Sequence, residues 1–419
     1  MYFKFKFNSQ VAENTIWLFA DKFIRLIGGL IIGTKLASYL GPSQYGQLAY
    51  ATAIVSFFLA TSVMGLESIV VRDLTNTSDK STLLGSTVVA RLFFGLISYI
   101  LFISYYILFD YEKYSSALIP VCIGLILVFQ FSDSFDLYYQ SIKKNSIPAR
   151  LKLLSYSVIN IIRVLFIYIL LSIEWFSLLI LFESILNTLI LFFYFKIDRK
   201  FNLKFNFKVL KKYLHESWPI IISGFSIIIY MKIDQIMVMN YLGSSKMGMY
   251  AAIINVMLVA QIFPQVLNQV LSPYFYQSKE ISYKKYVTNM RFYILIMVFF
   301  SFLFIVLIYI FADKIILILY GKEFDLSVIP LKIYSLSVLP LYIGMVQSIW
   351  IINRKNHKYP LIISVISAFL SYVLCTLMIP TYGLMGASWV VVICGIIANL
   401  VLPIIFMPDL RKLYGFSNG

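Results

Sequence analysis

The most constraining feature of this sequence is a set of long apolar runs without charged residues. Three examples are 292–311, 333–352 and 384–406, each long enough to cross the roughly 30 Å hydrocarbon core of a bilayer as a helix. The runs are apolar on every face, whereas the strands of a membrane barrel alternate polar and apolar residues. Only 13% of the residues are charged and 60% are hydrophobic, which excludes an ordinary water-soluble domain. We therefore predict an all-α polytopic membrane protein.

Breaks at charged residues and at Pro or Gly clusters divide the chain into about twelve transmembrane helices. The predicted segments are 14–40, 45–74, 83–109, 118–140, 153–171, 175–195, 218–241, 247–276, 292–311, 330–353, 361–379 and 384–406. We group them into an N-terminal six-helix lobe (1–195), a basic cytoplasmic linker (196–217) and a C-terminal six-helix lobe (218–419). Most of the 35 Lys and Arg residues fall on one side of this alternation. That side is cytoplasmic by the positive-inside rule, so both termini are predicted to be cytoplasmic.

An internal repeat supports the division into two lobes. The sequence YLGPSQYG at 39–46 recurs as YLGSSKMG at 241–248, in each case between the first and second helices of a lobe. Since each lobe has an even number of helices, the two repeats share one orientation in the membrane. We expect the two six-helix lobes to surround a central cavity that opens to one side and then to the other.

Charged residues inside the apolar segments are the candidates for function, because a charge at the centre of a membrane helix costs about 2.5–3.5 kcal/mol on insertion scales. They are concentrated in the first seven segments. The cations that we predict to bind substrate are Arg25, Lys35, Arg91, Arg163 and Lys232. The acids that we predict to couple transport to ions are Asp21, Asp133, Asp136, Glu183 and Asp234.

The first segment has the most regular pattern. Asp21, Arg25, Gly28, Ile32 and Lys35 recur every three or four residues, which places them on one face of a helix. We interpret this face as a largely cationic stripe that points inward. An ion pair between Asp21 and Arg25, one turn apart, is the structural alternative.

Two roles stay open for the other charges. The guanidinium groups of Arg91 and Arg163 need an anion, which is either a phosphate-bearing ligand or one of the acids Asp133, Asp136 and Glu183. The acids in turn either take up protons or sodium during a transport cycle or neutralise the arginines permanently.

Catalysis and nucleic-acid binding find little support. His215 and His357 lie in predicted cytoplasmic loops without companions, and no Gly-rich phosphate loop occurs. The net charge of +16 belongs mostly to loops rather than to a basic face of a soluble module. Cys122, Cys375 and Cys394 have no ligand spacing and are interpreted as packing residues. We expect a secondary transporter rather than an enzyme, with no metal and no cofactor.

Several motifs together resemble a known family. They are Leu36-Ala37, Tyr39-Leu40-Gly41-Pro42, Tyr45-Gly46, Gly65-Leu66, Val71-Arg72, Asp234 followed by Tyr241-Leu242-Gly243, Gly248-Met249-Tyr250-Ala251-Ala252, and Tyr320-Gly321-Lys322-Glu323-Phe324. Their order resembles that of the polysaccharide repeat-unit flippases of the O-antigen (Wzx) type, within the multidrug/oligosaccharidyl-lipid/polysaccharide exporter superfamily. The similarity extends over nearly the whole chain.

The resemblance implies a two-lobe carrier in the bacterial inner membrane. Such a carrier moves an undecaprenyl-pyrophosphate-linked oligosaccharide from the cytoplasmic to the periplasmic leaflet by alternating access, coupled to a proton or sodium gradient. The implied partners are the lipid-linked oligosaccharide, the lipid bilayer, a polysaccharide polymerase and a chain-length regulator, in the pathway of O-antigen and lipopolysaccharide biosynthesis. The arginines and lysines would neutralise the pyrophosphate.

Two other functions stay open at this point. A multidrug exporter of the same superfamily would also combine acids with aromatic residues in its helices. A membrane-bound glycan polymerase or ligase would be equally hydrophobic and basic, but such enzymes usually carry a large periplasmic loop. Here the predicted outside loops are short, the longest being roughly 312–329.

Overall fold

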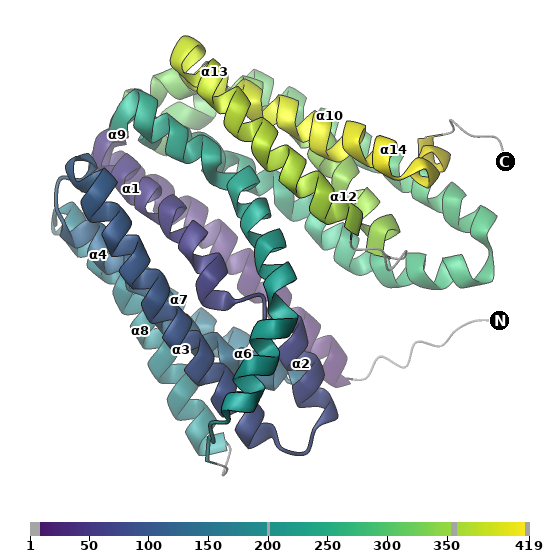
Figure 1. Cartoon of the computed structure of the whole chain (residues 1–419). Helices are drawn as coiled ribbons and strands as arrows, with labels where there is room; N and C mark the ends of the chain where they lie inside the picture. The colour runs from purple at the N-terminus through teal and green to yellow at the C-terminus, as the bar shows by residue number, and fades with distance from the viewer. Residues whose placement is uncertain (1–8, 199–201, 353–357, 415–419) are drawn as a thin grey trace. The chain divides into compact units, whose positions relative to one another are not determined.

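The computed structural model describes residues 9–198, 202–352 and 358–414, and every regular element within these ranges is a helix (Figure 1). The first eight α-helices are α1 (Ser9–Val63), α2 (Glu67–Asn76), α3 (Lys80–Tyr105), α4 (Leu118–Gly124), α5 (Ile126–Phe129), α6 (Asp133–Ser141), α7 (Ser146–Tyr168) and α8 (Ile173–Asp198). The next six are α9 (Phe207–Ile281), α10 (Tyr283–Tyr320), α11 (Val328–Ser335), α12 (Val338–Ile352), α13 (Lys358–Ile396) and α14 (Leu402–Phe406). Short π- or 3-10 turns are η1 (Tyr106–Asp110), η2 (Tyr111–Lys113), η3 (Gln130–Ser132), η4 (Lys322–Ser327), η5 (Ile397–Val401) and η6 (Pro408–Tyr414).

The lengths of these helices confirm the predicted fold class. In the described ranges, eight continuous helical stretches are long and apolar enough to span a membrane, and α11 with η4 and α12 form a ninth span bent by 43°. Three of the eight, Ala20–Val63, Gly224–Asn268 and Tyr359–Phe406, hold 44 to 48 residues, about twice the length that one crossing needs. One further span from each of these three brings the number to twelve. The protein is therefore an all-α multi-pass membrane protein.

Glycine interrupts each of the three long helices. Gly41 in α1, Gly243 in α9 and Gly383 in α13 have φ values of 72°, 81° and 58°, a left-handed region that residues with a Cβ atom rarely adopt. Pro42 follows Gly41 and has no N–H group to continue a helical hydrogen-bond ladder. The first two breaks fall inside the two copies of the repeat, which is why both copies keep their Leu-Gly pair.

The two copies of the repeat pack against each other. The hydroxyl oxygens of Ser43 and Ser244 are 2.9 Å apart and hydrogen-bonded. A Cβ atom added at Gly46 would lie 1.9 Å from the carbonyl oxygen of Ser244, and one added at Gly248 would lie 1.9 Å from that of Pro42. The backbones therefore approach too closely for any side chain at either glycine.

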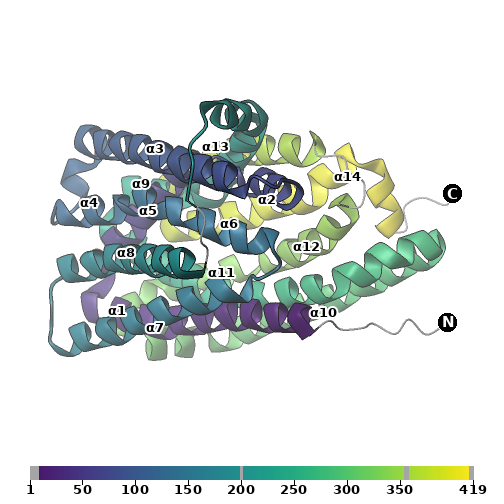
Figure 2. The same cartoon turned by 90° about the horizontal axis from the view of Figure 1, so that it is seen from below.

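The chain divides into two compact units. Unit 1 comprises Met1–Tyr39 and Gln47–Phe225, and unit 2 comprises Leu40–Gly46 and Ser226–Gly419. The division falls within α9 rather than at the predicted linker, and the loop of α1 that carries the first repeat belongs to unit 2. In unit 1, α8 packs side by side with both α4 and α7 (Figure 2). In unit 2, α10 packs against α11 and α12, and α11 packs against α13.

The predicted linker 196–217 is largely helical in the described residues. α8 continues to Asp198 and α9 begins at Phe207. The physical reason is that the first turns of α9 have an apolar side as well as lysines: Tyr213 is fully buried in the core of unit 1. The segment 202–206 runs along α3, where the Lys204 N–H donates to the Ser81 carbonyl at 3.3 Å. Gly85 permits this approach, since a Cβ atom there would lie 2.3 Å from the carbonyl oxygen of Lys204.

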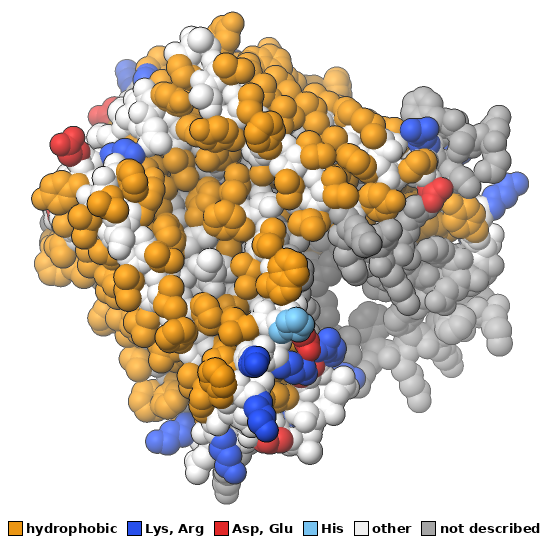
Figure 3. Space-filling view, viewed as in Figure 1, with side chains coloured by type: hydrophobic (Ala, Val, Ile, Leu, Met, Phe, Trp, Pro, Cys, Tyr) orange, Lys and Arg blue, Asp and Glu red, His pale blue; other side chains and the backbone are white. Residues whose placement is uncertain are grey.

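Hydrophobic side chains cover most of the described surface seen in Figure 3. Phe299, Phe302 and Phe369, for example, are each about two-thirds exposed. A protein in water would bury such side chains, whereas in a bilayer they contact lipid.

Candidate functional site

Four of the predicted site residues form one charged network in unit 1. The Nε atom of Arg25 donates to the Asp21 carboxylate at 2.7 Å, one turn earlier on α1. The Glu183 carboxylate of α8 lies 3.7 Å from Arg25 Nη1 and 3.6 Å from Arg163 Nη2 of α7. All four side chains keep between 15% and 28% of their surface exposed. We call these four residues the Arg25–Arg163 network.

Neighbouring groups fix the two arginines of this network. The Arg25 guanidinium lies over the Tyr156 ring, 4.9 Å from its centroid, and the Tyr156 hydroxyl donates to the Arg25 carbonyl at 3.0 Å. Gly28 leaves room for that ring, because a Cβ atom there would lie 2.9 Å from the Tyr156 hydroxyl. Arg163 donates through Nη1 to the Asn160 side-chain oxygen at 2.8 Å. The two guanidinium groups are therefore held by contacts independent of Glu183.

A second cluster in unit 1 contains the other two acids predicted on the fourth span. The Lys152 ammonium of α7 donates to Asp133 at 2.7 Å and also to Asp136. Each of these three side chains keeps about a quarter to a third of its surface exposed. One lysine between two carboxylates leaves a net negative charge, so the cluster attracts a further cation.

Arg91 is the nearest candidate for that cation. It lies on α3, is completely buried, and is within electrostatic range of Asp133, Glu67 and Asp136. Its Nε and Nη2 atoms have no hydrogen-bond partner among the described residues. Arg91 is thus close to the acids that were its predicted alternative partners, without a direct ion pair to any of them within 4.0 Å in the described ranges.

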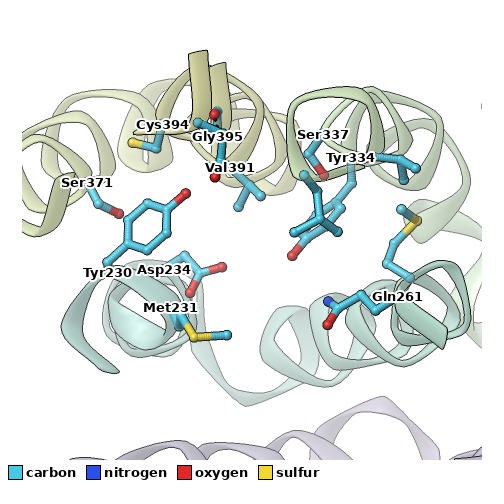
Figure 4. Close-up of a pocket in the computed structure, with 14 residues that line it drawn as sticks. Tyr230, Met231, Asp234, Gln261, Tyr334, Ser337, Ser371, Val391, Cys394 and Gly395 are labelled. Atoms are coloured by element: carbon cyan, nitrogen blue, oxygen red, sulfur yellow. Dashed lines mark hydrogen bonds between the residues drawn. The ribbon is translucent and has the colours of Figure 1, made fainter. Parts of the chain in front are cut away.

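Asp234 occupies a pocket in unit 2. The Tyr250 hydroxyl donates to one carboxylate oxygen at 2.6 Å and the Gln235 backbone N–H donates to the other at 2.8 Å. The pocket has a volume of about 130 Å³. In Figure 4, Asp234 and Tyr230 of α9 face Ser371 and Cys394 of α13 across it. Further polar groups that line it are Gln261, Tyr334, Ser337 and Asn399.

The last two predicted cations lie apart from these clusters. Lys35 is exposed on α1, so the stripe predicted along the first segment ends at the surface of the unit rather than among charged partners. Lys232 is half-buried on α9 and lies within electrostatic range of Asp234. The described residues contain no group of three or more His, Cys, Asp or Glu that could hold a metal ion.

Sequence reasoning missed several residues of these sites. Lys152 is a cation like the predicted site residues, but it directly precedes the predicted segment 153–171 and so is not among the charges expected inside the membrane. Tyr156 and Asn160 precede Arg163 by two turns and by one turn, so the helical spacing that singled out Asp21 and Arg25 would have found them. Tyr250 is far from Asp234 in sequence, and only the hairpin at Gly243 brings it near.

Comparisons with known proteins agree with this architecture. Residues 11–279 match the family described as "Polysaccharide biosynthesis protein". The capsular polysaccharide biosynthesis protein CapF of Staphylococcus aureus is 26% identical over 170 residues, which cover 40% of this chain and 42% of that protein. The aligned region thus spans less than half the length of this curated relative.

Solved structures show the same fold. The lipid II flippase MurJ, in an inward closed conformation, is similar with a TM-score of 0.76 at 19% identity, covering 96% of this chain and 90% of that chain. An inward-facing multidrug resistance MATE family transporter of the MOP superfamily is similar with a TM-score of 0.64 at 15% identity, covering 97% of this chain and 96% of that one.

The chain therefore shares its fold with the lipid II flippase MurJ and with a MATE family transporter. The chain itself belongs to the polysaccharide biosynthesis protein family, whose model matches more than half of its residues. The predicted fold is confirmed, and the predicted relationship to polysaccharide flippases is confirmed at the level of the polysaccharide biosynthesis protein family.

Proposed function

We propose that the protein is a flippase for lipid-linked oligosaccharides, and that it moves undecaprenyl-pyrophosphate-linked repeat units of a surface polysaccharide across the bacterial inner membrane. Its family, its transporter fold and the name of its capsular relative support this proposal. The polysaccharide is either the O-antigen of lipopolysaccharide or a capsule. Transport proceeds by alternating access, and both termini lie in the cytoplasm, since Lys and Arg are concentrated on that side. The polymerase and chain-length regulator of the pathway would receive the product.

The observation that carries the proposal is the pair of partly exposed arginines in the Arg25–Arg163 network. Arginine presents its N–H donors in a planar fork that suits the oxygens of phosphate, and it keeps its charge even when buried. Arg25 Nη2 is a buried atom without a hydrogen-bond partner in the described part of the chain, so this guanidinium has one N–H group that its protein neighbours leave unsatisfied. We assign the pyrophosphate to Arg25 and Arg163. Lys35, Arg91 and Lys232 remain predicted cations without a defined ligand.

Ion coupling is assigned to Asp234. Its carboxylate lies beside a polar pocket whose hydroxyl and amide oxygens are ligands that sodium accepts, and a carboxylate in such a site also takes up protons. Asp133 and Asp136 share Lys152, so we assign them the permanent neutralisation of buried cations rather than ion coupling. Asp21 serves mainly to hold Arg25. An Asp234→Asn variant keeps the size of the side chain and is expected to make transport insensitive to the proton or sodium gradient.

A multidrug exporter is the second candidate, because the MATE transporter shares the fold. The two functions are separated by deleting the gene and measuring surface polysaccharide and drug sensitivity together. We expect lost polysaccharide with unchanged drug sensitivity. Normal polysaccharide with increased drug sensitivity would favour the exporter instead.

Complementation of that deletion tests the arginine assignment. Arg25→Gln and Arg163→Gln should each restore less than a tenth of the surface polysaccharide, since each removes about 1.5–3 kcal/mol of charged hydrogen bonding to phosphate. Lys196→Gln, at the exposed end of α8, is the matched control and should complement fully. Membrane levels of each variant are measured by immunoblot. Full complementation by both arginine variants would refute the assignment.

A further inference from the structure

One carboxylate lies between the two arginines without a hydrogen bond to either. The Glu183 oxygens lie 3.7 Å from Arg25 Nη1 and 3.6 Å from Arg163 Nη2. Charged N–H···O hydrogen bonds are about 2.7–2.9 Å long, and the bond from Arg25 to Asp21 has that length. Glu183 is therefore attracted to both guanidinium groups and bound tightly by neither.

The arginines do not depend on Glu183 for their positions. Asp21 and the Tyr156 ring hold Arg25, and the Asn160 side chain holds Arg163. If Glu183 turned away, both guanidinium groups would keep these contacts. The space between them would then be open to another anion.

The charges of the network are balanced only while Glu183 stays in place. Arg25 and Arg163 are cationic, and Asp21 and Glu183 are anionic, so the sum is zero. A pyrophosphate carries at least two negative charges and competes with Glu183 for the same donors. A pyrophosphate linked at both ends has two non-bridging oxygens on each phosphorus, so either phosphate group can replace the two carboxylate oxygens of Glu183.

We propose that Glu183 is an internal competitor of the substrate: it occupies the place of a phosphate group between Arg25 and Arg163 and is displaced when an isoprenoid pyrophosphate binds. This inference rests on the proposed function. The competitor lowers the affinity of the arginine pair, which allows a carrier to release its cargo after each crossing. It also prevents two adjacent guanidinium groups from repelling each other in the empty protein.

The test is a binding measurement on the purified full chain in detergent. Glu183→Gln removes the charge and keeps the shape of the side chain. We expect it to bind farnesyl pyrophosphate about tenfold more tightly than the wild type, equivalent to about 1.4 kcal/mol. Glu174→Gln makes the same chemical change in the first turn of the same helix and should bind like the wild type. Inorganic pyrophosphate should show a similar gain in Glu183→Gln, because the competition concerns the pyrophosphate group, and farnesol should show none.

A purely structural role for Glu183 predicts no gain in affinity for farnesyl pyrophosphate when its charge is removed. If Glu183 only tied the helices together, Glu183→Gln would bind farnesyl pyrophosphate equally or more weakly, and that result would overturn the inference. A gain confined to farnesol would overturn it too. A failure of the proposed function gives a different result: if it is wrong, Arg163→Gln binds farnesyl pyrophosphate as well as the wild type does. Weak binding by Arg163→Gln together with an unchanged Glu183→Gln would therefore refute the competitor and leave the arginine site standing.

Discussion

Adding one methyl group at Gly46 or Gly248 should strongly destabilise unit 2. The Cβ atom of Gly46→Ala would lie 1.9 Å from the Ser244 carbonyl oxygen and 2.7 Å from the Gly248 nitrogen. Both are backbone atoms, so no side chain can turn aside to relieve the contact. Bringing the Cβ to a distance of 3.0 Å requires the two repeat segments to separate by about 1 Å. Overpacking of this kind costs about 1–3 kcal/mol, and we expect the upper end of that range.

The expected effect on the melting temperature is a decrease of about 6–12 °C, from about 3 kcal/mol at 2–4 °C per kcal/mol for a unit of this size. Cys122, Cys375 and Cys394 are all buried, so a thiol-reactive fluorescent dye reports unfolding without added labels. Gly248→Ala places its Cβ 1.9 Å from the Pro42 carbonyl oxygen and should behave in the same way. The double variant should cost less than the sum of the two, because the first methyl group already separates the segments.

Gly33→Ala is the control for this experiment. Nothing lies within 4 Å of a Cβ atom at Gly33, and the residue is inside α1. Alanine is favoured over glycine in a helix by about 1 kcal/mol, so this variant should melt at the same or a higher temperature. A Gly46→Ala protein that unfolds within 2 °C of the wild type would refute the close packing of the two repeats.

Two further predictions concern ion pairs in unit 1. Burial alone would raise the pKa of Asp73, but hydrogen bonds from Lys212 and Arg72 hold that pKa below its usual value. Asp73→Asn should therefore lower the free energy of unfolding by about 0.5 kcal/mol at pH 7. In thermal unfolding, the difference between this variant and the wild type should persist down to about pH 4 and vanish as the pH falls through the lowered pKa of Asp73. A difference that grew in acid would contradict this prediction. Lys152→Met should cost about 2 kcal/mol by leaving two carboxylates unpaired, and adding Asp136→Asn should restore about half of that loss in the same unfolding assay. Strictly additive effects of the two changes would show that they do not interact.

The helices and their breaks were predictable because they depend on local features. Apolar runs without charge fix the spans, and a Leu-Gly pair marks where α1 and α9 are interrupted. The repeat at 39–46 and 241–248 also predicted that the two breaks are equivalent. The contact between the copies at Gly46 and Gly248 depends on tertiary packing, and the sequence indicates it only by placing a glycine at the same position in both copies.

The candidate sites were predictable only in part. The ion pair of Asp21 with Arg25 follows from a four-residue spacing on one helix. The approach of Glu183 to Arg25 and Arg163 depends on how α1, α7 and α8 pack, and no spacing along the chain encodes it. The same limit applies to the predicted linker, because its lysines are evident in the sequence, whereas the burial of Tyr213 in the core of unit 1 depends on tertiary packing.

Transport in proteoliposomes tests the central claim most directly. The purified protein is reconstituted with a fluorescent isoprenoid pyrophosphate-linked saccharide, and a membrane-impermeant quencher is added outside. We expect the wild type to bring nearly all of the label within reach of the quencher, while Arg163→Gln leaves the inner-leaflet pool protected, as in vesicles without protein. Equal protection in wild-type and empty vesicles, under an imposed proton or sodium gradient of either direction, would contradict the assignment as a flippase for lipid-linked oligosaccharides.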